Sequence, residues 1–347
     1  MIPREFLIGY GFKQCQVEES LYCLNDEGNL LILVLYVDDL LYFSPETTFL
    51  EKLEASLKKN FKIKFKELAE KFVGVEIRHH DQGIEISQNE NVEKMLETFE
   101  MRNAKPAETP METLLVPDNE GKKLEDIKLY QSILGSLSYL MLSTRPDLSY
   151  SVNSLSRYNK SPSYTNIKQL KRILRYLKKF SSEKLNYSQR NDDFKIEMFV
   201  DSEHGKNKDC KSTYGYIAYI CGVPVCYKTK KLPVVTTSST ESEFLAISES
   251  AKKLMWIKNI FEFLGIKLAE TTLWNDNRGA VLICKKVKSC LRTRHINIRH
   301  FHVRELIENG EFEVKHISGE ENIADGFTKS LGSTKFTKFR NDLFHQN

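Results

Sequence analysis

Apolar positions in the first hundred residues follow strand-like and helix-like spacings in turn. Two apolar segments, 21–24 and 30–37, flank a turn-forming stretch at 25–29 and predict a β-hairpin. Residues 46–59 place their apolar side chains on one stripe, which predicts a helix. Beyond it the pattern predicts short strands at 72–77 and 84–87 and a helix at 92–99.

The second half of the chain changes its pattern at residue 194. Residues 130–142 and 167–180 have helical spacing, whereas the chain beyond them alternates between strands and helices. The predicted strands are 196–200, 213–220, 223–227, 271–275 and 312–317, and the predicted helices are 241–264, 277–286, 298–308 and 322–330. Three consecutive strands followed by interleaved helices and strands indicate an α/β (α+β) protein with a mixed sheet flanked by helices.

Two polar stretches suggest how the chain divides. Residues 106–121 contain three prolines and predict an exposed loop, and residues 181–193 lack a core pattern. We therefore expect four parts, which are residues 1–105, 106–190, 191–335 and a C-terminal tail at 336–347.

Basic residues are concentrated in two blocks, although the net charge is only +4. Residues 157–190 hold ten Lys and Arg with a single acid, and residues 285–304 hold seven with none. Blocks of one sign favour contact with a polyanion such as nucleic acid, and the alternative is a solvated charged face. The residues expected to contact phosphates are Lys168, Lys171, Arg172, Arg175, Lys178, Lys179, Arg292, Arg294 and Arg299.

The seven cysteines form no CxxC pair, so the sequence predicts free thiols in a reducing compartment and no zinc site. The longest apolar run, 30–43, is interrupted by Asp38 and Asp39 and is too short to span a bilayer. With no signal peptide apparent, we expect an intracellular protein, cytoplasmic or nuclear, without a membrane partner or a small-molecule cofactor.

Four carboxylates in the second half are candidate metal ligands. Asp201 and Asp276 each end a predicted strand, whereas Glu243 and Asp325 begin predicted helices. Such acids can converge at one sheet edge, and their mutual repulsion favours bound cations. Mg²⁺ or Mn²⁺ suits carboxylate ligands, and two ions roughly 3.5–4 Å apart can activate water against a phosphodiester.

Each acid also has a simpler explanation. Glu243 follows Thr240 by three residues, which is the spacing of a capping box. Asp276 can cap the helix after it, and Asp325 can be a solvated helix residue. Asp201 is hardest to explain this way, because no evident turn follows its strand.

The order Asp, Glu, Asp, Asp on strand, helix, strand and helix resembles the ribonuclease H fold. The local sequences are similar to the copia-type long-terminal-repeat retrotransposon Pol polyprotein. They are 211–216 (KSTYGY), 238–244 (SSTESEF), 276–277 (DN), 292–299 (RTRHINIR) and 323–329 (IADGFTK). The resemblance implies that Asp201, Glu243, Asp276 and Asp325 are catalytic, hold two Mg²⁺ or Mn²⁺ ions, and cleave RNA in RNA–DNA hybrids.

The sequence departs from the family pattern in two places. The first motif reads Asp-Ser-Glu-His-Gly at 201–205, where the family usually has an Asp-Ala-Asp-Trp-like run. Asn297 stands where an aspartate is usual. His316 is the candidate for the mobile histidine of other ribonucleases H, and the alternative is an ordinary polar residue at a strand end.

The first half resembles the reverse-transcriptase palm of the same family. The segment 33–41 (LVLYVDDLL) carries Asp38 and Asp39, which that resemblance assigns to metal-assisted nucleotidyl transfer, whereas the alternative is a polar hairpin tip. Further family-like segments are 72–77 (FVGVEI), 135–140 (GSLSYL), 144–148 (TRPDL) and 171–177 (KRILRYL). Residues 1–105 would then be a partial palm, 106–190 the connection and 191–335 the ribonuclease H domain.

Polymerase chemistry in this family needs a third aspartate on an earlier strand. Asp26 is the sole aspartate before Asp38, and it falls in a predicted turn. We therefore expect no polymerase activity from this chain alone, and exposed palm strands invite self-association. Two alternatives remain open: an inactive nucleic-acid-binding remnant of a transposable element, or part of a longer working reverse transcriptase.

Overall fold

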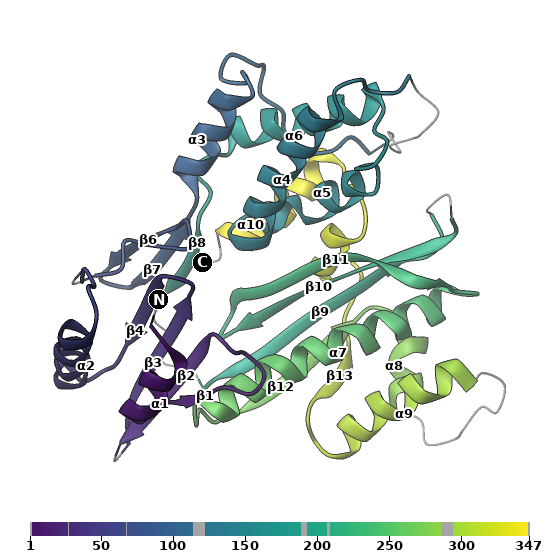
Figure 1. Cartoon of the computed structure of the whole chain (residues 1–347). Helices are drawn as coiled ribbons and strands as arrows, with labels where there is room; N and C mark the ends of the chain where they lie inside the picture. The colour runs from purple at the N-terminus through teal and green to yellow at the C-terminus, as the bar shows by residue number, and fades with distance from the viewer. Residues whose placement is uncertain are drawn as a thin grey trace. The chain divides into compact units, whose positions relative to one another are not determined.

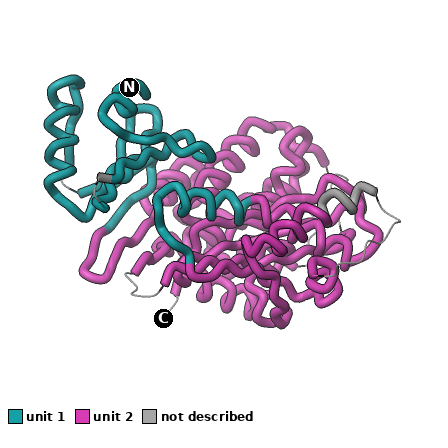
Figure 2. Tube along the Cα trace, turned by 90° about the horizontal axis from the view of Figure 1, so that it is seen from below, with its two compact units in different colours: residues 1–78, 253–268 teal, residues 79–252, 269–347 magenta. Residues whose placement is uncertain are grey.

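The computed structural model describes residues 2–26, 28–66, 68–113, 122–188, 193–206, 209–285 and 294–345. The chain forms two compact units, which are coloured separately in Figure 2. Unit 1 comprises residues 1–78 and 253–268, and unit 2 comprises residues 79–252 and 269–347. The described part of the chain contains no helix long and apolar enough to cross a membrane.

Unit 1 is built on an antiparallel sheet in the order β1-β2-β3-β4. Its strands are β1 (Lys13–Gln14), β2 (Leu21–Asp26), β3 (Asn29–Tyr36) and β4 (Asp39–Phe43). The helices α1 (Arg4–Tyr10) and α2 (Thr47–Asn60) bury Leu7, Leu53 and Leu57 in one core with Leu31 and Leu33 of β3. The predicted β2–β3 hairpin and the predicted helix at 46–59 are therefore present.

The strand predicted at 72–77 is divided by a tight turn. β5 (Lys71–Phe72) pairs with β6 (Val75–His80), and Phe72 lies opposite Val75. The two residues between them, Val73 and Gly74, have φ values of 46° and 74°. Two consecutive positive φ angles are typical of the two-residue turn whose twist matches a hairpin.

Unit 2 contains a five-stranded mixed sheet in the order β11-β10-β9-β12-β13 (Figure 1). The strands β9 (Lys195–Glu203), β10 (Lys211–Ile220) and β11 (Val223–Val235) are antiparallel, and β12 (Glu270–Asn275) runs parallel to β9 and β13 (Glu313–His316). The accompanying helices are α7 (Ser239–Phe263), α8 (Arg278–Lys285) and α9 (Arg294–Glu308). The predicted α/β class with a mixed sheet and flanking helices is confirmed.

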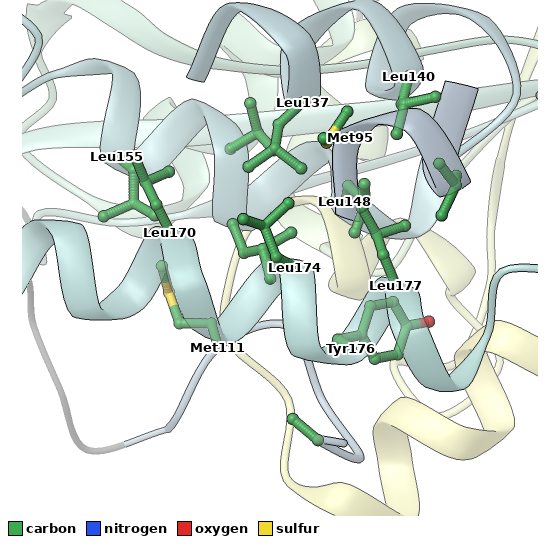
Figure 3. Packing of buried hydrophobic residues seen from close by; sticks show 14 of the residues in the cluster. Met95, Met111, Leu137, Leu140, Leu148, Leu155, Leu170, Leu174, Tyr176 and Leu177 are labelled. Atoms are coloured by element: carbon green, nitrogen blue, oxygen red, sulfur yellow. The ribbon is translucent and has the colours of Figure 1, made fainter. Parts of the chain in front are cut away.

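The helices α7, α8 and α9 lie on one face of this sheet, and a layer of other helices packs against the opposite face (Figure 1). Its helices are α3 (Asn89–Thr98), α4 (Ile127–Ser143), α5 (Ser149–Ser156), α6 (Tyr164–Lys179) and α10 (Ser333–Phe344). Figure 3 shows their interlocking apolar side chains, with Leu137 of α4 and Leu174 of α6 fully buried. The same core includes Ile217 and Phe327, so the helical layer and the sheet share one hydrophobic interior.

A buried ion pair lies at the base of this layer. Arg145 Nη2 is 2.7 Å from Asp147 Oδ2, and both side chains are almost fully buried. The hydroxyl of Tyr176 donates to the same carboxylate at 2.6 Å, and Arg145 Nη1 donates to the Phe180 carbonyl at 2.8 Å. Every charged atom of this pair has a partner, so neither buried charge is left uncompensated. The family-like segment 144–148 (TRPDL) therefore has a structural role, in which it connects α4 to α6 and to Phe344 of α10.

Three further elements differ from the sequence prediction. Residues 181–193, expected to be a boundary, contain β8 (Leu185–Ser188), which pairs with β7 (Gly83–Ser87). Four residues are too few to show a period, although Leu185 is buried. The tail expected at 336–347 lies mostly in α10, whose Phe336, Phe339 and Leu343 are buried at helical spacing. The helix predicted at 322–330 is the 3-10 helix η2 (Ile323–Phe327).

Candidate metal centre

Three aspartates from three separate elements meet at one point in unit 2. Asp201 lies within β9, Asp276 directly follows β12, and Asp325 lies in η2. One carboxylate oxygen from each lies within 4.8 Å of those of the other two. β9 and β12 are parallel neighbours, so residues at their carboxyl ends meet at the same sheet edge. This arrangement offers hard oxygen ligands of the kind that Mg²⁺ prefers.

Glu243 borders this group but is not one of the three. Its side chain is 5% exposed, and its Oε2 accepts a 2.9 Å hydrogen bond from Asn275 Nδ2. The amide of Asn275 also donates to the Val200 carbonyl at 3.1 Å, which ties α7, β9 and β12 together. Glu243 is close enough to Asp201 and Asp276 for their charges to act on it. The structure thus places all four predicted acids in one neighbourhood.

The helix caps are made by other residues. The α7 start is capped by Ser238, whose Oγ accepts from the Glu241 backbone N–H at 3.2 Å, and by Glu241 Oε2, which accepts from the Thr237 N–H at 2.7 Å. The α8 start is capped by Asn277 Oδ1, which accepts from the Ala280 N–H at 2.9 Å. Capping therefore accounts for neither Glu243 nor Asp276.

The loop that carries Asp325 is fastened to the sheet by side chains that the sequence analysis did not single out. Asn322 Nδ2 donates to the Val200 carbonyl at 3.0 Å. The hydroxyl of Thr328 donates to Asp201 Oδ2, and Lys329 Nζ lies 2.7 Å from Asp325 Oδ1. Thr328 and Lys329 belong to the family-like segment 323–329, and Asn322 directly precedes it; this position was the available signal. Residues of one short loop thus position two of the three aspartates.

Two glycines allow this loop to approach closely. Gly215 of β10 pairs directly with Asp201, and a Cβ there would collide with the Cβ of Phe327 and lie 3.0 Å from its carbonyl carbon. The Phe327 carbonyl accepts a 2.7 Å hydrogen bond from Thr229 Oγ1 of β11. On the other side, a Cβ on Gly326 would collide with the Phe339 ring of α10. η2 is therefore held between the sheet and α10.

The acids repel one another in a poorly solvated place. Burial, followed by the Asp325 charge, raises the pKa of Asp201 to about 7. Burial and the Asp201 charge raise the pKa of Glu243 well above its ordinary value. Burial and the Asp325 charge also raise the pKa of Asp276. Because a divalent cation would relieve this repulsion, the cluster fits a metal ion on electrostatic grounds.

His316, the candidate for the mobile histidine, ends β13 opposite Asn275. Its side chain is exposed, and its charge acts to lower the pKa of Asp276. It therefore lies near the cluster, and its catalytic role stays a prediction.

Asp38 and Asp39 occupy a different setting in unit 1. Asp39 pairs with Tyr36 at the β3–β4 turn, where Val37 has φ 53°, and both acids are exposed. They line an open cavity of about 770 Å³ together with Lys62, Lys64 and other residues of the same unit. Within the described part of the chain, no third carboxylate joins them in a metal-ligand group.

Four of the six basic side chains that the sequence analysis singled out on α6 bind another segment of this chain. Arg172 pairs with Glu112 at 2.7 Å, and Lys179 pairs with Glu108. Arg175 Nε donates to the Lys105 carbonyl at 2.5 Å, and Lys178 Nζ donates to the Ala104 carbonyl at 3.0 Å. These four side chains hold segment 104–112 against the helix.

Other predicted phosphate contacts have different positions. Lys168 and Lys171 of α6 are exposed. Arg292 lies outside the described residues, and Arg294 and Arg299 belong to α9 with side chains that are likewise not described. The nucleic-acid contacts of all these residues stay predictions.

The mixed sheet, with acids supplied by strand, helix, strand and loop, defines a ribonuclease H-like domain. Residues 3–113 match a family model described as reverse transcriptase (RNA-dependent DNA polymerase). The Pol polyprotein of transposon RE2 from Arabidopsis thaliana is 32% identical over 339 residues, which is 97% of this chain and 23% of the polyprotein. An uncharacterized mitochondrial protein of the same plant is 33% identical over 228 residues, covering 65% of this chain and 94% of its own length.

The chain belongs to the copia-type retrotransposon Pol family, as its sequence predicted, and spans about a quarter of the length of the RE2 polyprotein. Among solved structures, LC11-RNase H1, isolated from compost, is similar with 14% identity and a TM-score of 0.32. That similarity covers 39% of this chain and 92% of LC11-RNase H1.

Proposed function

We propose that unit 2 is a metal-dependent ribonuclease H that hydrolyses the RNA strand of RNA–DNA hybrids. The observation that carries this proposal is the convergence of Asp201, Asp276 and Asp325 within 4.8 Å on a ribonuclease H-like sheet. Phosphodiester hydrolysis needs a site that gathers divalent cations beside a phosphate, and one buried and two half-buried carboxylates can form such a site.

The three aspartates would hold the ions, and Glu243 would complete the set from α7. Two Mg²⁺ or Mn²⁺ ions, when bound, supply an activated water and offset the charge that develops on the phosphate. The chain's own residues set the geometry. Thr328 holds Asp201 by its hydroxyl, and Asn275 holds Glu243 by its amide. Such fixed second partners keep carboxylates in the orientation that metal binding requires.

The test is cleavage of a hybrid with labelled RNA in the presence of Mg²⁺. We expect wild-type protein to cut the RNA strand, and Asp276→Asn to lower the rate by at least about 100-fold, since even outer-shell changes cost roughly 10–100-fold. Asp81→Asn is the matched control, because Asp81 is an exposed turn residue of the same unit. A folded wild-type protein that binds hybrid without cutting it would favour an inactive nucleic-acid-binding remnant instead.

We further propose that this chain alone does not polymerise DNA. Its support is the exposed Asp38–Asp39 turn, which no third carboxylate joins in the described residues. Extension of a primer on an RNA template by the purified chain would refute this part.

A further inference from the structure

Lys329 places a cation directly against the carboxylate cluster. Its Nζ lies 2.7 Å from Asp325 Oδ1, and its side chain is 38% exposed. Although burial opposes it, the hydrogen bond to Asp325 and the charges of Asp201 and Asp325 raise the pKa of Lys329. The ammonium group therefore interacts with more than its immediate partner.

The backbone around Lys329 is fixed. The N–H groups of Thr328 and Lys329 both donate to the Asp325 carbonyl, at 3.2 and 3.3 Å. The Thr328 side chain is fully buried and bonds to Asp201. Only the flexible stem of Lys329 separates its charge from this rigid turn, so the ammonium can move without any change in the aspartates.

The positive charge of Lys329 offsets part of the negative charge of the cluster. Three aspartates and the neighbouring Glu243 crowd negative charge into a place where Asp201 is only 5% exposed. Among the described ion pairs, Lys329 with Asp325 is the one that involves a member of the aspartate group. A single positive charge at this position lowers the repulsion when no metal is bound, and it also competes with an incoming metal ion.

We propose that Lys329 is a built-in counter-ion of the metal centre, which stabilises the metal-free cluster through Asp325 and yields that position when divalent ions bind. Once released, the ammonium remains beside the cluster, where a phosphate of the hybrid would lie. This last step rests on the proposed ribonuclease activity, whereas the counter-ion role does not. Lys329 is thus a positioning residue whose effect is measurable without substrate.

The experiment compares Lys329→Met, Lys329→Arg and the control Lys335→Met, whose lysine is exposed on α10. Methionine keeps the unbranched stem and removes the charge, so packing changes little. In the presence of a chelator, we expect Lys329→Met to have a lower Tm than wild type. Saturating Mg²⁺ should then raise its Tm more than it raises the wild-type Tm.

Ion affinity provides the second readout. Calorimetric titration with Mg²⁺ should show roughly fivefold tighter binding to Lys329→Met, because a competing charge a few ångströms away is gone. Lys329→Arg and Lys335→Met should both bind like wild type. If Lys329→Met does not fold, Lys329→Gln is titrated in its place. Unchanged Tm and unchanged affinity in the neutral variant would overturn the proposal.

The same proteins separate this inference from the proposed function. Tighter Mg²⁺ binding by Lys329→Met, together with an inactive wild type, would support the counter-ion and refute the nuclease. Hybrid cleavage by wild type, with no effect of Lys329→Met on ion binding, would support the nuclease and refute the counter-ion. If both proposals hold, Lys329→Met should bind ions more tightly and yet cleave hybrid more slowly.

Discussion

The two groups of acids in this chain reach their positions by opposite routes. Asp38 and Asp39 are neighbours in sequence and lie exposed at one hairpin turn of unit 1. Asp201, Asp276 and Asp325 are far apart in sequence, and the fold of unit 2 brings them within 4.8 Å of one another. Both groups stand out equally in the sequence, yet only the second forms a metal-ligand group in the described residues.

The difference shows what a set of carboxylates needs in order to hold a metal ion. Asp38 lies in the turn and Asp39 begins β4, so this hairpin supplies two adjacent carboxylates from one short segment. In unit 2, by contrast, parallel strands, a glycine opposite Asp201 and a loop fixed by hydrogen bonds direct side chains from separate elements to one place. A third carboxylate beside Asp38 and Asp39 would be needed to give unit 1 the same property.

The sharpest test of this contrast is the hydrolysis of a hybrid by paired variants. Asp201→Asn should lower the cleavage rate by about 100-fold or more, because it removes a ligand from the centre of the cluster. The double variant Asp38→Asn, Asp39→Asn should retain the wild-type rate within about twofold. Equal losses in both proteins would mean that the hairpin contributes to the same reaction, and the comparison would fail.

The second test concerns the space that the fold reserves for the loop. Gly215→Ala should cost about 1–3 kcal/mol of unfolding free energy, because the new methyl group meets Phe327. Gly9→Ala in α1 of unit 1 is the control, since nothing lies within 4 Å of its Cβ position. That control should be neutral or stabilising by up to about 1 kcal/mol. Denaturant unfolding with Mg²⁺ removed by a chelator measures both.

The third test uses pH. Since the folded-state pKa of Asp201 is raised from 3.8 to about 7, the folded protein holds a proton that the unfolded chain releases. Stability of the metal-free protein should therefore fall as pH rises from 6 to 8, by an amount on the order of 1 kcal/mol. Asp201→Asn should weaken this dependence, whereas the Asp38, Asp39 double variant should keep it. A metal-free protein that is more stable at pH 8 would contradict the electrostatics described here.

The smallest effects are expected from substitutions on α6. Its basic side chains carry the same charge, but Lys168 and Lys171 are exposed, whereas Arg172 is paired with other residues of the chain. Lys168→Gln with Lys171→Gln should weaken hybrid binding several-fold and reduce its salt dependence by roughly one unit per lost phosphate contact. Arg172→Gln should instead lower thermal stability, because Arg172 holds Glu112 and Thr109. Binding at several salt concentrations and thermal melts separate the two roles. A reversed result would show that segment 104–112 leaves the helix when hybrid binds.

The sequence predicted those parts of the fold in which apolar residues repeat at a regular spacing over many residues. The mixed sheet, its helices and the four acids of unit 2 were all anticipated, because strand ends and helix starts mark where side chains converge. β8 was missed because four residues cannot show a period, and α10 was missed because its buried Phe336 and Phe339 lie among basic residues. Asn275 and Thr328 were missed for a different reason: their partners are set by tertiary contacts that no local pattern contains.

Helix α10 has a practical consequence for anyone who excises the ribonuclease H-like domain. The boundary suggested by sequence, residue 335, would cut this helix just before the phenylalanines that support η2. A fragment ending there would retain all four acids of the cluster and still lack the Phe339 ring that packs against Gly326, next to Asp325. If such a fragment were inactive, the cause would be the lost packing of α10 and not a lost acidic residue. A useful fragment therefore has to extend through Phe344.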